Sequence, residues 1–113
     1  MNSQEQWLNE FLACRKNYDK EDKAVWNHTM QTYASAFKSE AIGEKDKHLM
    51  ALCVGVAEHC QPCTLGHLKV AISTGATKEE ILETIGVAIS MCGTMAMGGA
   101  WMVFQYMDEQ GLL

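Results

Sequence analysis

The chain has 113 residues, of which 48% are hydrophobic and 20% are charged, and its formal net charge at pH 7 is −5. This length and composition predict one domain with enough apolar side chains to form a core. The acidic balance leaves no basic stripe to meet phosphates, which argues against a nucleic-acid partner.

Apolar residues recur at helical spacing in the first half of the chain. Residues 3–14 carry aromatic and leucine side chains at three- and four-residue intervals, which predicts a short amphipathic helix. A polar break at residues 15–22 follows, and residues 24–38 repeat the helical pattern. After a loop at residues 39–43, the nearly continuous apolar positions of residues 45–58 predict a helix that is buried on most sides.

The next helix is placed by a proline and a glycine. Pro62 has no N–H and a restricted φ, so it suits the first turn of a helix and predicts a helix start near Gln61. Gly75 is a plausible residue to end that helix, because glycine tolerates the left-handed backbone common just after a helix C-terminus.

Two further helices follow. Thr77 and Glu80 have the spacing of a capping box and predict a helix over residues 78–92. Gly93 marks a break before a last helix over residues 95–107. No stretch shows the alternation typical of strands, so the sequence predicts an all-α fold of about six helices.

The final third of the chain is long and uncharged. No charged residue lies between Glu83 and Asp108, a length sufficient to cross a bilayer. The glycines in this segment, its acidic flanks and the absence of Lys or Arg after Lys78 favour two helices buried in a protein interior instead, much of which would be a subunit interface. Methionines would fill irregular space there, namely Met91, Met95, Met97, Met102 and Met107.

The number of cysteines indicates the cellular compartment to expect. The chain has five cysteines, an odd number, and no charged start with an apolar run precedes the domain. A secreted disulfide framework is therefore not expected, and we expect a reducing cytoplasm. A CxxC pair in that setting is more often redox-active or metal-binding than structural.

Reactive side chains are concentrated in one segment, Glu58 to His67, which reads EHCQPCTLGH. Cys60 and Cys63 flank the predicted helix start, where unpaired N–H groups favour anions and lower the pKa of a thiol. His67 lies four residues after Cys63 on the same helical face and can act as its proton acceptor. A thiol with a base at this spacing predicts an activated sulfur nucleophile.

Several motifs in this order resemble a known family. The runs EKDKHLM at residues 44–50, CQPCTLGH at residues 60–67 and GATKEEI at residues 75–81 are similar to the carboxymuconolactone decarboxylase and alkylhydroperoxidase D-like superfamily. The resemblance covers roughly residues 20–110, which leaves residues 1–20 as an N-terminal helical extension of one domain spanning residues 1–113. It implies an all-helical subunit in a homotrimer or homohexamer.

The resemblance also implies roles for individual residues. The CxxC-bearing branch of the superfamily reduces hydroperoxides, so Cys63 would attack the peroxide, Cys60 would close the disulfide and His67 would belong to a proton relay. An external dithiol would then reduce the disulfide, either a lipoyl group or a thioredoxin-like protein. The resemblance implies no cofactor.

One position departs from the family pattern. Members with this chemistry usually have a glutamate twelve residues before the first cysteine, and this chain has His48 there. If the helices on either side of Glu58 form an antiparallel hairpin, His48 would lie near His67. Either His48 or a carboxylate from Glu58 would then replace the missing glutamate.

Other functions are compatible with the same residues. Cys60 and Cys63 could bind zinc, with His67 and either Glu58 or His59 as further ligands, or could sense redox state in a non-catalytic subunit. A lactone decarboxylase of the same superfamily is a further alternative, although that branch generally lacks the cysteine pair. A thioredoxin fold is a weaker alternative because the strands it requires are not predicted.

Overall fold

The computed structural model describes residues 3–113, and these residues form α-helices and no strand. The all-α class predicted from the sequence is therefore confirmed. The helices are α1 (Gln4–Arg15), α2 (Asn17–Glu21), α3 (Lys23–Phe37), α4 (Glu44–Ala57), α5 (Gln61–Ser73), α6 (Lys78–Cys92) and α7 (Thr94–Glu109). The five-residue helix α2 lies in the segment expected to be a polar break.

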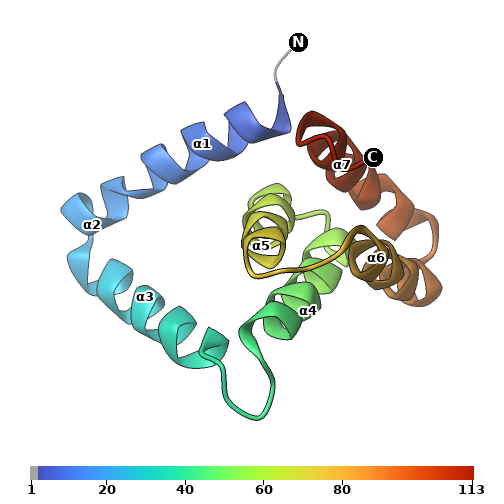
Figure 1. Cartoon of the computed structure of the whole chain (residues 1–113). Helices are drawn as coiled ribbons and strands as arrows, with labels where there is room; N and C mark the ends of the chain where they lie inside the picture. Colours follow the sequence, from blue (N-terminus) through green and yellow to red (C-terminus); the bar gives the residue numbers. More distant parts are fainter. Residues whose placement is uncertain (1–2) are drawn as a thin grey trace.

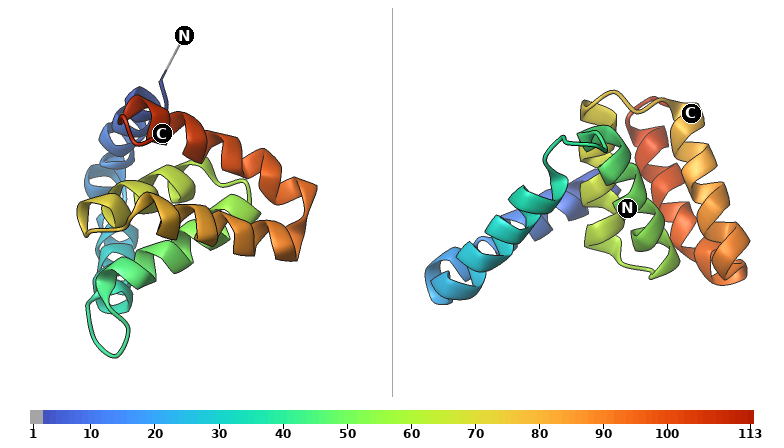
Figure 2. Two further views of the ribbon diagram at one scale, coloured as in Figure 1. Left: turned by 45° about the vertical axis from the view of Figure 1, so that its right-hand side comes forward. Right: turned by 90° about the horizontal axis from the view of Figure 1, so that it is seen from below.

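The helices form two parts. Helices α4 to α7 pack together as a bundle, whereas α1, α2 and α3 form a bent arm that runs around one side of α5 (Figure 1). Seen from below, α2 and α3 project away from the bundle (Figure 2). No residue of α3 is buried, so this arm is held mainly at its two ends.

The predicted helix boundaries agree closely with the structure, because they depend on local backbone chemistry. Cys60 is the N-cap of α5, and Pro62 lies in the first turn. Thr77 and Glu80 form both hydrogen bonds of a capping box at the start of α6. Gly75 and Gly93 have φ angles of +104° and +59°, a region that glycine adopts without steric cost.

The core of the bundle depends on close approach of helix backbones. Leu52, Val56, Leu65 and Leu68 are fully buried between α4, α5 and the neighbouring helices. A Cβ atom built on Gly99 of α7 would lie 2.3 Å from the Val56 carbonyl oxygen. This distance is far below van der Waals contact, so α7 can lie against α4 only because residue 99 has no side chain.

Helix α1 is docked on the bundle at its N-terminal end. The Gln4 backbone N–H donates to a Glu109 carboxylate oxygen at 2.9 Å, and the Gln4 side chain donates to Gln105 at 3.0 Å. Gln61, in the first turn of α5, donates to the Gln4 side-chain oxygen at 3.0 Å. With Leu8 buried beneath them, these contacts fix the arm beside the segment that carries the cysteines.

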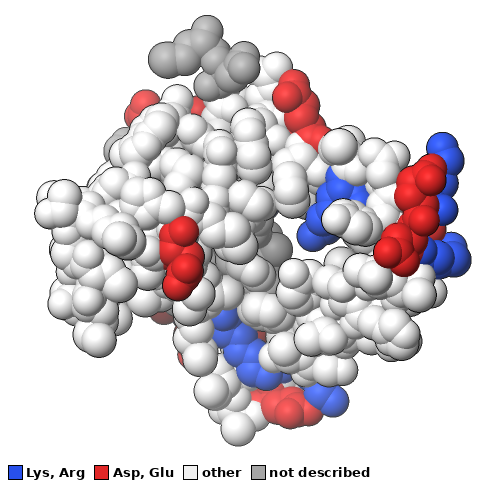
Figure 3. Space-filling model, turned by 180° about the vertical axis from the view of Figure 1, so that it is seen from behind, with Lys and Arg blue, Asp and Glu red and all other residues white. Residues whose placement is uncertain are grey.

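The final third of the chain is only partly buried within a single chain. Met102 and Met107 are in the core, but the other methionines predicted to fill an interior, Met91, Met95 and Met97, are more than half exposed in the single chain. The bundle is too small to cover both sides of α6 and α7, and the face that they present is largely uncharged (Figure 3). Among residues 3–113, no helix is both long enough and apolar enough to span a bilayer.

Candidate active site

Cys60 and Cys63 form a disulfide at the start of α5, with their Cα atoms 5.2 Å apart. The Cys60 sulfur also accepts a hydrogen bond from the Cys63 backbone N–H at 3.3 Å. Cys63 is exposed and Cys60 is half-buried. The two sulfurs are thus close enough for reversible bonding, and Cys63 is the one more open to a small molecule.

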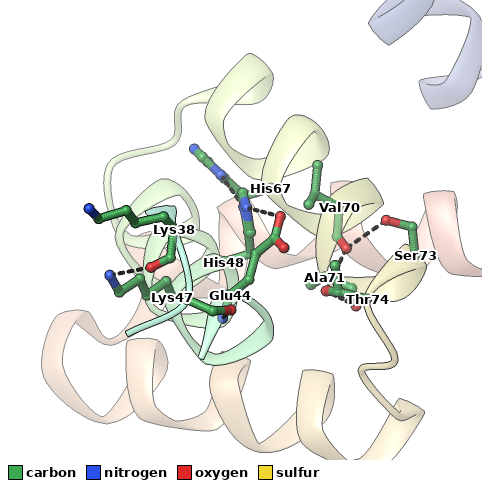
Figure 4. A network of polar contacts seen from close by, with 10 residues as sticks. Lys38, Glu44, Lys47, His48, His67, Val70, Ala71, Ser73 and Thr74 are labelled. Carbon is green, nitrogen blue, oxygen red and sulfur yellow. Dashed lines mark hydrogen bonds and ion pairs between the residues drawn. The ribbon is translucent and has the colours of Figure 1, made fainter. Parts of the chain in front are cut away.

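His48 and His67 lie side by side, because α4 and α5 form an antiparallel hairpin. Their Nδ1 atoms are 3.0 Å apart, and the contact is drawn in Figure 4. His48 is 8% exposed, and His67 is partly exposed. The structure therefore brings together two imidazoles that are nineteen residues apart in the sequence, as expected for such a hairpin.

An aromatic side chain from the arm covers the histidine pair. The Phe37 ring stacks on His48 at a centroid distance of 4.5 Å and on His67 at 5.0 Å. Phe37 is the last residue of α3, so the end of the arm positions it over both rings. This contact excludes water from one face of the imidazoles.

Sequence reasoning missed the carboxylate nearest to this pair, which is that of Glu44. Its Oε1 atom lies 3.8 Å from His48 Nε2. Glu44 precedes His48 by four residues, a spacing that places both side chains on one helical face. That spacing is the signal that could have identified it.

The three side chains imply a direction for the proton between the rings. Two Nδ1 atoms at 3.0 Å can share one proton, so one imidazole donates and the other accepts. The Glu44 carboxylate favours a proton on His48 Nε2, which makes His48 Nδ1 the acceptor and His67 Nδ1 the donor. In neutral His67, Nε2 is then the unprotonated, basic nitrogen.

Burial acts on the pKa of both histidines. Desolvation lowers the pKa of His48, and the Glu44 charge partly opposes this by raising it. Desolvation also lowers the pKa of His67, and repulsion from His48 lowers it further. Both groups are therefore held neutral to lower pH than an exposed histidine, as a proton acceptor near neutral pH requires.

These shifts predict that acid destabilises the fold. Unfolding returns both pKa values to about 6.5, so below that pH the unfolded chain binds more protons than the folded one. We expect the free energy of unfolding to be highest above pH 6.5 and to fall as the pH drops through the lower folded values. Urea denaturation between pH 5 and 8, roughly the range in which histidine titrates, would measure this change. The same series with His67→Gln should show a weaker pH dependence, and an equal dependence in both proteins would contradict the assignment.

A cavity of about 620 Å³ lies between the arm and the bundle, and Cys63, His48 and His67 are among its lining residues. Most of the lining is apolar and comes from α1, α3 and α5, including Leu8, Leu12, Phe37 and Val70. Figure 3 shows the molecule hollowed between the arm and the bundle. A small molecule in this cavity would thus meet one sulfur of the disulfide and the histidine pair together.

Two other candidate residues lie apart from this arrangement. Glu58 is exposed at the end of α4, and no hydrogen bond or ion pair of its side chain is present within residues 3–113. His59 has a positive φ of 56°, and its Nε2 atom contacts the Met95 carbonyl oxygen of α7. In the described part of the chain, no group of three or more His, Cys, Asp or Glu side chains is placed to hold a metal ion.

The fold and the site define the class of protein. It is an all-helical protein in which one sulfur of a CxxC disulfide at a helix N-terminus and a pair of histidines line one apolar cavity. The sequence model of the carboxymuconolactone decarboxylase family matches residues 24–105. The chain belongs to this family, which confirms the resemblance noted from its motifs.

Individual relatives agree with this assignment. A carboxymuconolactone decarboxylase family protein from Legionella pneumophila superposes with a TM-score of 0.86 at 25% sequence identity, covering 93% of this chain and 95% of that one. "Uncharacterized protein 4 in cox locus" of Paracoccus denitrificans is 36% identical over 73 residues, which are 65% of this chain and 66% of that protein. Alkyl hydroperoxide reductase AhpD of Corynebacterium kroppenstedtii is 38% identical over 52 residues, which are 46% of this chain and 30% of that protein.

Proposed function

We propose that the protein is a thiol peroxidase that reduces hydroperoxides through Cys60 and Cys63. The observation that carries the proposal is the CxxC disulfide beside the histidine pair at one cavity. Similarity to an alkyl hydroperoxide reductase supports it. The disulfide of the structure corresponds to the oxidised state of the cycle.

Cys63 is assigned as the attacking sulfur. It lines the cavity and is exposed, whereas Cys60 is half-buried and is not among the lining residues. In the reduced protein, the backbone N–H groups and positive dipole at the start of α5 would stabilise a thiolate at this position. Cys60, one helical turn away, is placed to resolve the oxidised sulfur.

The reaction balances in three steps. The Cys63 thiolate takes the distal oxygen of ROOH and becomes a sulfenic acid, while RO⁻ leaves and is protonated to ROH. The Cys60 thiolate then attacks the Cys63 sulfur, which forms the disulfide and releases water after one further protonation. An external dithiol reduces the disulfide by exchange, and a lipoyl group or a thioredoxin-like protein has the required chemistry.

The histidine pair would move the protons of this cycle. His67 Nε2 accepts the proton of the Cys63 thiol and returns it to the leaving alkoxide. The charge that this creates on His67 is shared with His48 through the Nδ1 contact and is offset by the Glu44 carboxylate. Glu44 thus acts as a positioning residue. It lies one helical turn before position 48, where related peroxidases carry a glutamate and this chain has His48.

Counting thiols on the reduced, full-length protein tests this function. One equivalent of hydroperoxide should remove two of the five thiols per chain and release one equivalent of alcohol. Metal analysis of the same sample distinguishes zinc binding by the cysteines from redox sensing. Loss of a single thiol, no loss, or stoichiometric zinc with unreactive thiols would count against the peroxidase.

Replacing Glu44 with glutamine should weaken catalysis without removing it. The change deletes the charge that raises the pKa of His48, so the shared imidazolium becomes less stable. We expect kcat/KM to fall about five-fold, since a charge near a partly exposed site contributes on the order of 1 kcal/mol. The acid limb of the pH–rate profile should move to lower pH.

A matched control for this variant is Glu79→Gln, at an exposed glutamate in the first turn of α6. It should leave both the rate and the pH profile as in the native chain. A Glu44→Gln enzyme with an unshifted acid limb would contradict the positioning role, even if its rate were lower.

Assembly is part of the same proposal. The exposed apolar side chains of α6 and α7, such as Met91, Met95 and Trp101, form a surface of the kind buried between subunits. We infer a homotrimer or homohexamer, as the family resemblance implies. Sedimentation equilibrium of the intact chain measures this directly.

A further inference from the structure

The charged side chains that line the cavity are cationic. These are Arg15 at the end of α1 and Lys69 on α5; the two histidines of the lining are neutral, and no Asp or Glu is among the described residues that line the cavity. Figure 3 shows blue side chains bordering the hollow. In a protein whose net charge is −5, a cavity lined by positive charge alone is unlike the rest of the surface.

Arg15 is held in place without an anionic partner. Its guanidinium carbon lies 5.5 Å from the centroid of the Trp26 ring, so α3 supports it through a cation–π contact. Its Nε atom is buried and has no hydrogen-bond partner, and no ion pair within residues 3–113 includes Arg15 or Lys69. The guanidinium lines the cavity and has no partner among the described residues, so it is available to an acceptor brought by a ligand.

The remainder of the cavity fits an apolar molecule. Leu8, Phe11, Leu12, Tyr33 and Val70 contribute to its walls. Its volume of about 620 Å³ lies within the range of pockets that enclose small organic ligands. A ligand that fills it would have an apolar body and one anionic group.

We propose that the cavity binds an organic hydroperoxide that carries a carboxylate, with Arg15 binding the carboxylate and the peroxide group facing Cys63. This rests on the proposed peroxidase function and adds the substrate class. The planar guanidinium can donate two parallel hydrogen bonds to a carboxylate, and Lys69 adds a second positive charge at the same cavity. Specificity for such substrates therefore comes from the arm, outside the CxxC segment.

A binding experiment tests the carboxylate site independently of catalysis. Isothermal titration of the full-length protein with octanoate and with octanol compares two ligands that differ mainly in the anionic group. Octanoate should bind at least about ten-fold more tightly, since hydrogen bonds from a guanidinium to a carboxylate are stronger than those to a neutral hydroxyl. Arg15→Gln should remove this preference, Arg15→Lys should retain part of it, and Lys69→Gln should weaken it.

The matched control is Lys78→Gln, which removes one positive charge at an exposed residue that does not line the cavity. It should keep the full preference for octanoate. Equal binding of octanoate and octanol by the native chain, or an unchanged preference in both Arg15 variants, would overturn the proposal. Circular dichroism of each variant excludes loss of fold as the cause.

A kinetic experiment then tests whether the carboxylate site acts in hydroperoxide reduction. The ratio of kcat/KM for a fatty-acid hydroperoxide to that for its methyl ester should exceed one in the native chain and fall about ten-fold in Arg15→Gln, mainly through KM. A ratio near one in the native chain would overturn the substrate class while leaving the peroxidase intact. Arg15-dependent octanoate binding with no consumption of any hydroperoxide would instead refute the peroxidase and support the carboxylate site.

Discussion

Cys63→Ser is expected to abolish hydroperoxide consumption, and Cys60→Ser is expected to permit one turnover per chain. A serine hydroxyl at position 63 is not ionised near neutral pH and cannot take the peroxide oxygen. Without Cys60, the Cys63 sulfenic acid has no resolving thiol beside it and accumulates. Stopped-flow measurement of peroxide loss, with trapping of the sulfenic acid, distinguishes the two variants.

The matched control for both is Cys92→Ser, because Cys92 is an exposed free cysteine at the end of α6. That variant should retain the native steady-state rate. Full activity of Cys63→Ser would refute its role as the nucleophile. If Cys63→Ser, rather than Cys60→Ser, supported the single turnover, the roles of the two sulfurs would be reversed.

Gly99→Ala is expected to cause a large loss of stability. The added Cβ would lie 2.3 Å from the Val56 carbonyl oxygen and 3.2 Å from the Val56 carbonyl carbon, which are backbone atoms that no side-chain rotation can move. Helices α4 and α7 must separate to accept it, and such overpacking costs about 1–3 kcal/mol or more. Urea denaturation of the purified variant measures the change in the free energy of unfolding.

Gly86→Ala provides the control for this effect. Gly86 lies inside α6, and a Cβ built there meets no atom within 4 Å. The same substitution should therefore stabilise the protein by about 0.5–1 kcal/mol, because alanine favours the helix. If both variants changed stability by the same amount and sign, the close approach of α7 to Val56 would not be a determinant of the fold.

Local signals in the sequence located most helix ends. Pro62, Gly75, Gly93 and the capping box of Thr77 and Glu80 act on their own backbone, so they could be interpreted without knowing the neighbours. Helix α2 was missed because its five residues bury nothing and so carry no apolar periodicity. Helix α2 contacts α1 and α3 and presents no face toward the core.

By itself, the sequence determined the all-helical class, the family and the cysteine pair of the candidate site, since each depends on residues close together in the chain. Tertiary structure alone decided that Arg15 and Phe37 reach the same cavity as Cys63, whereas the four-residue spacing of Glu44 and His48 is already present in the sequence. It also decided which uncharged residues of the last two helices are buried. The cavity depends on the packing of α1 and α3 against α4 and α5, and the burial of α6 and α7 depends on their packing against the bundle. Spacing along one helix contains no information about how it packs against another.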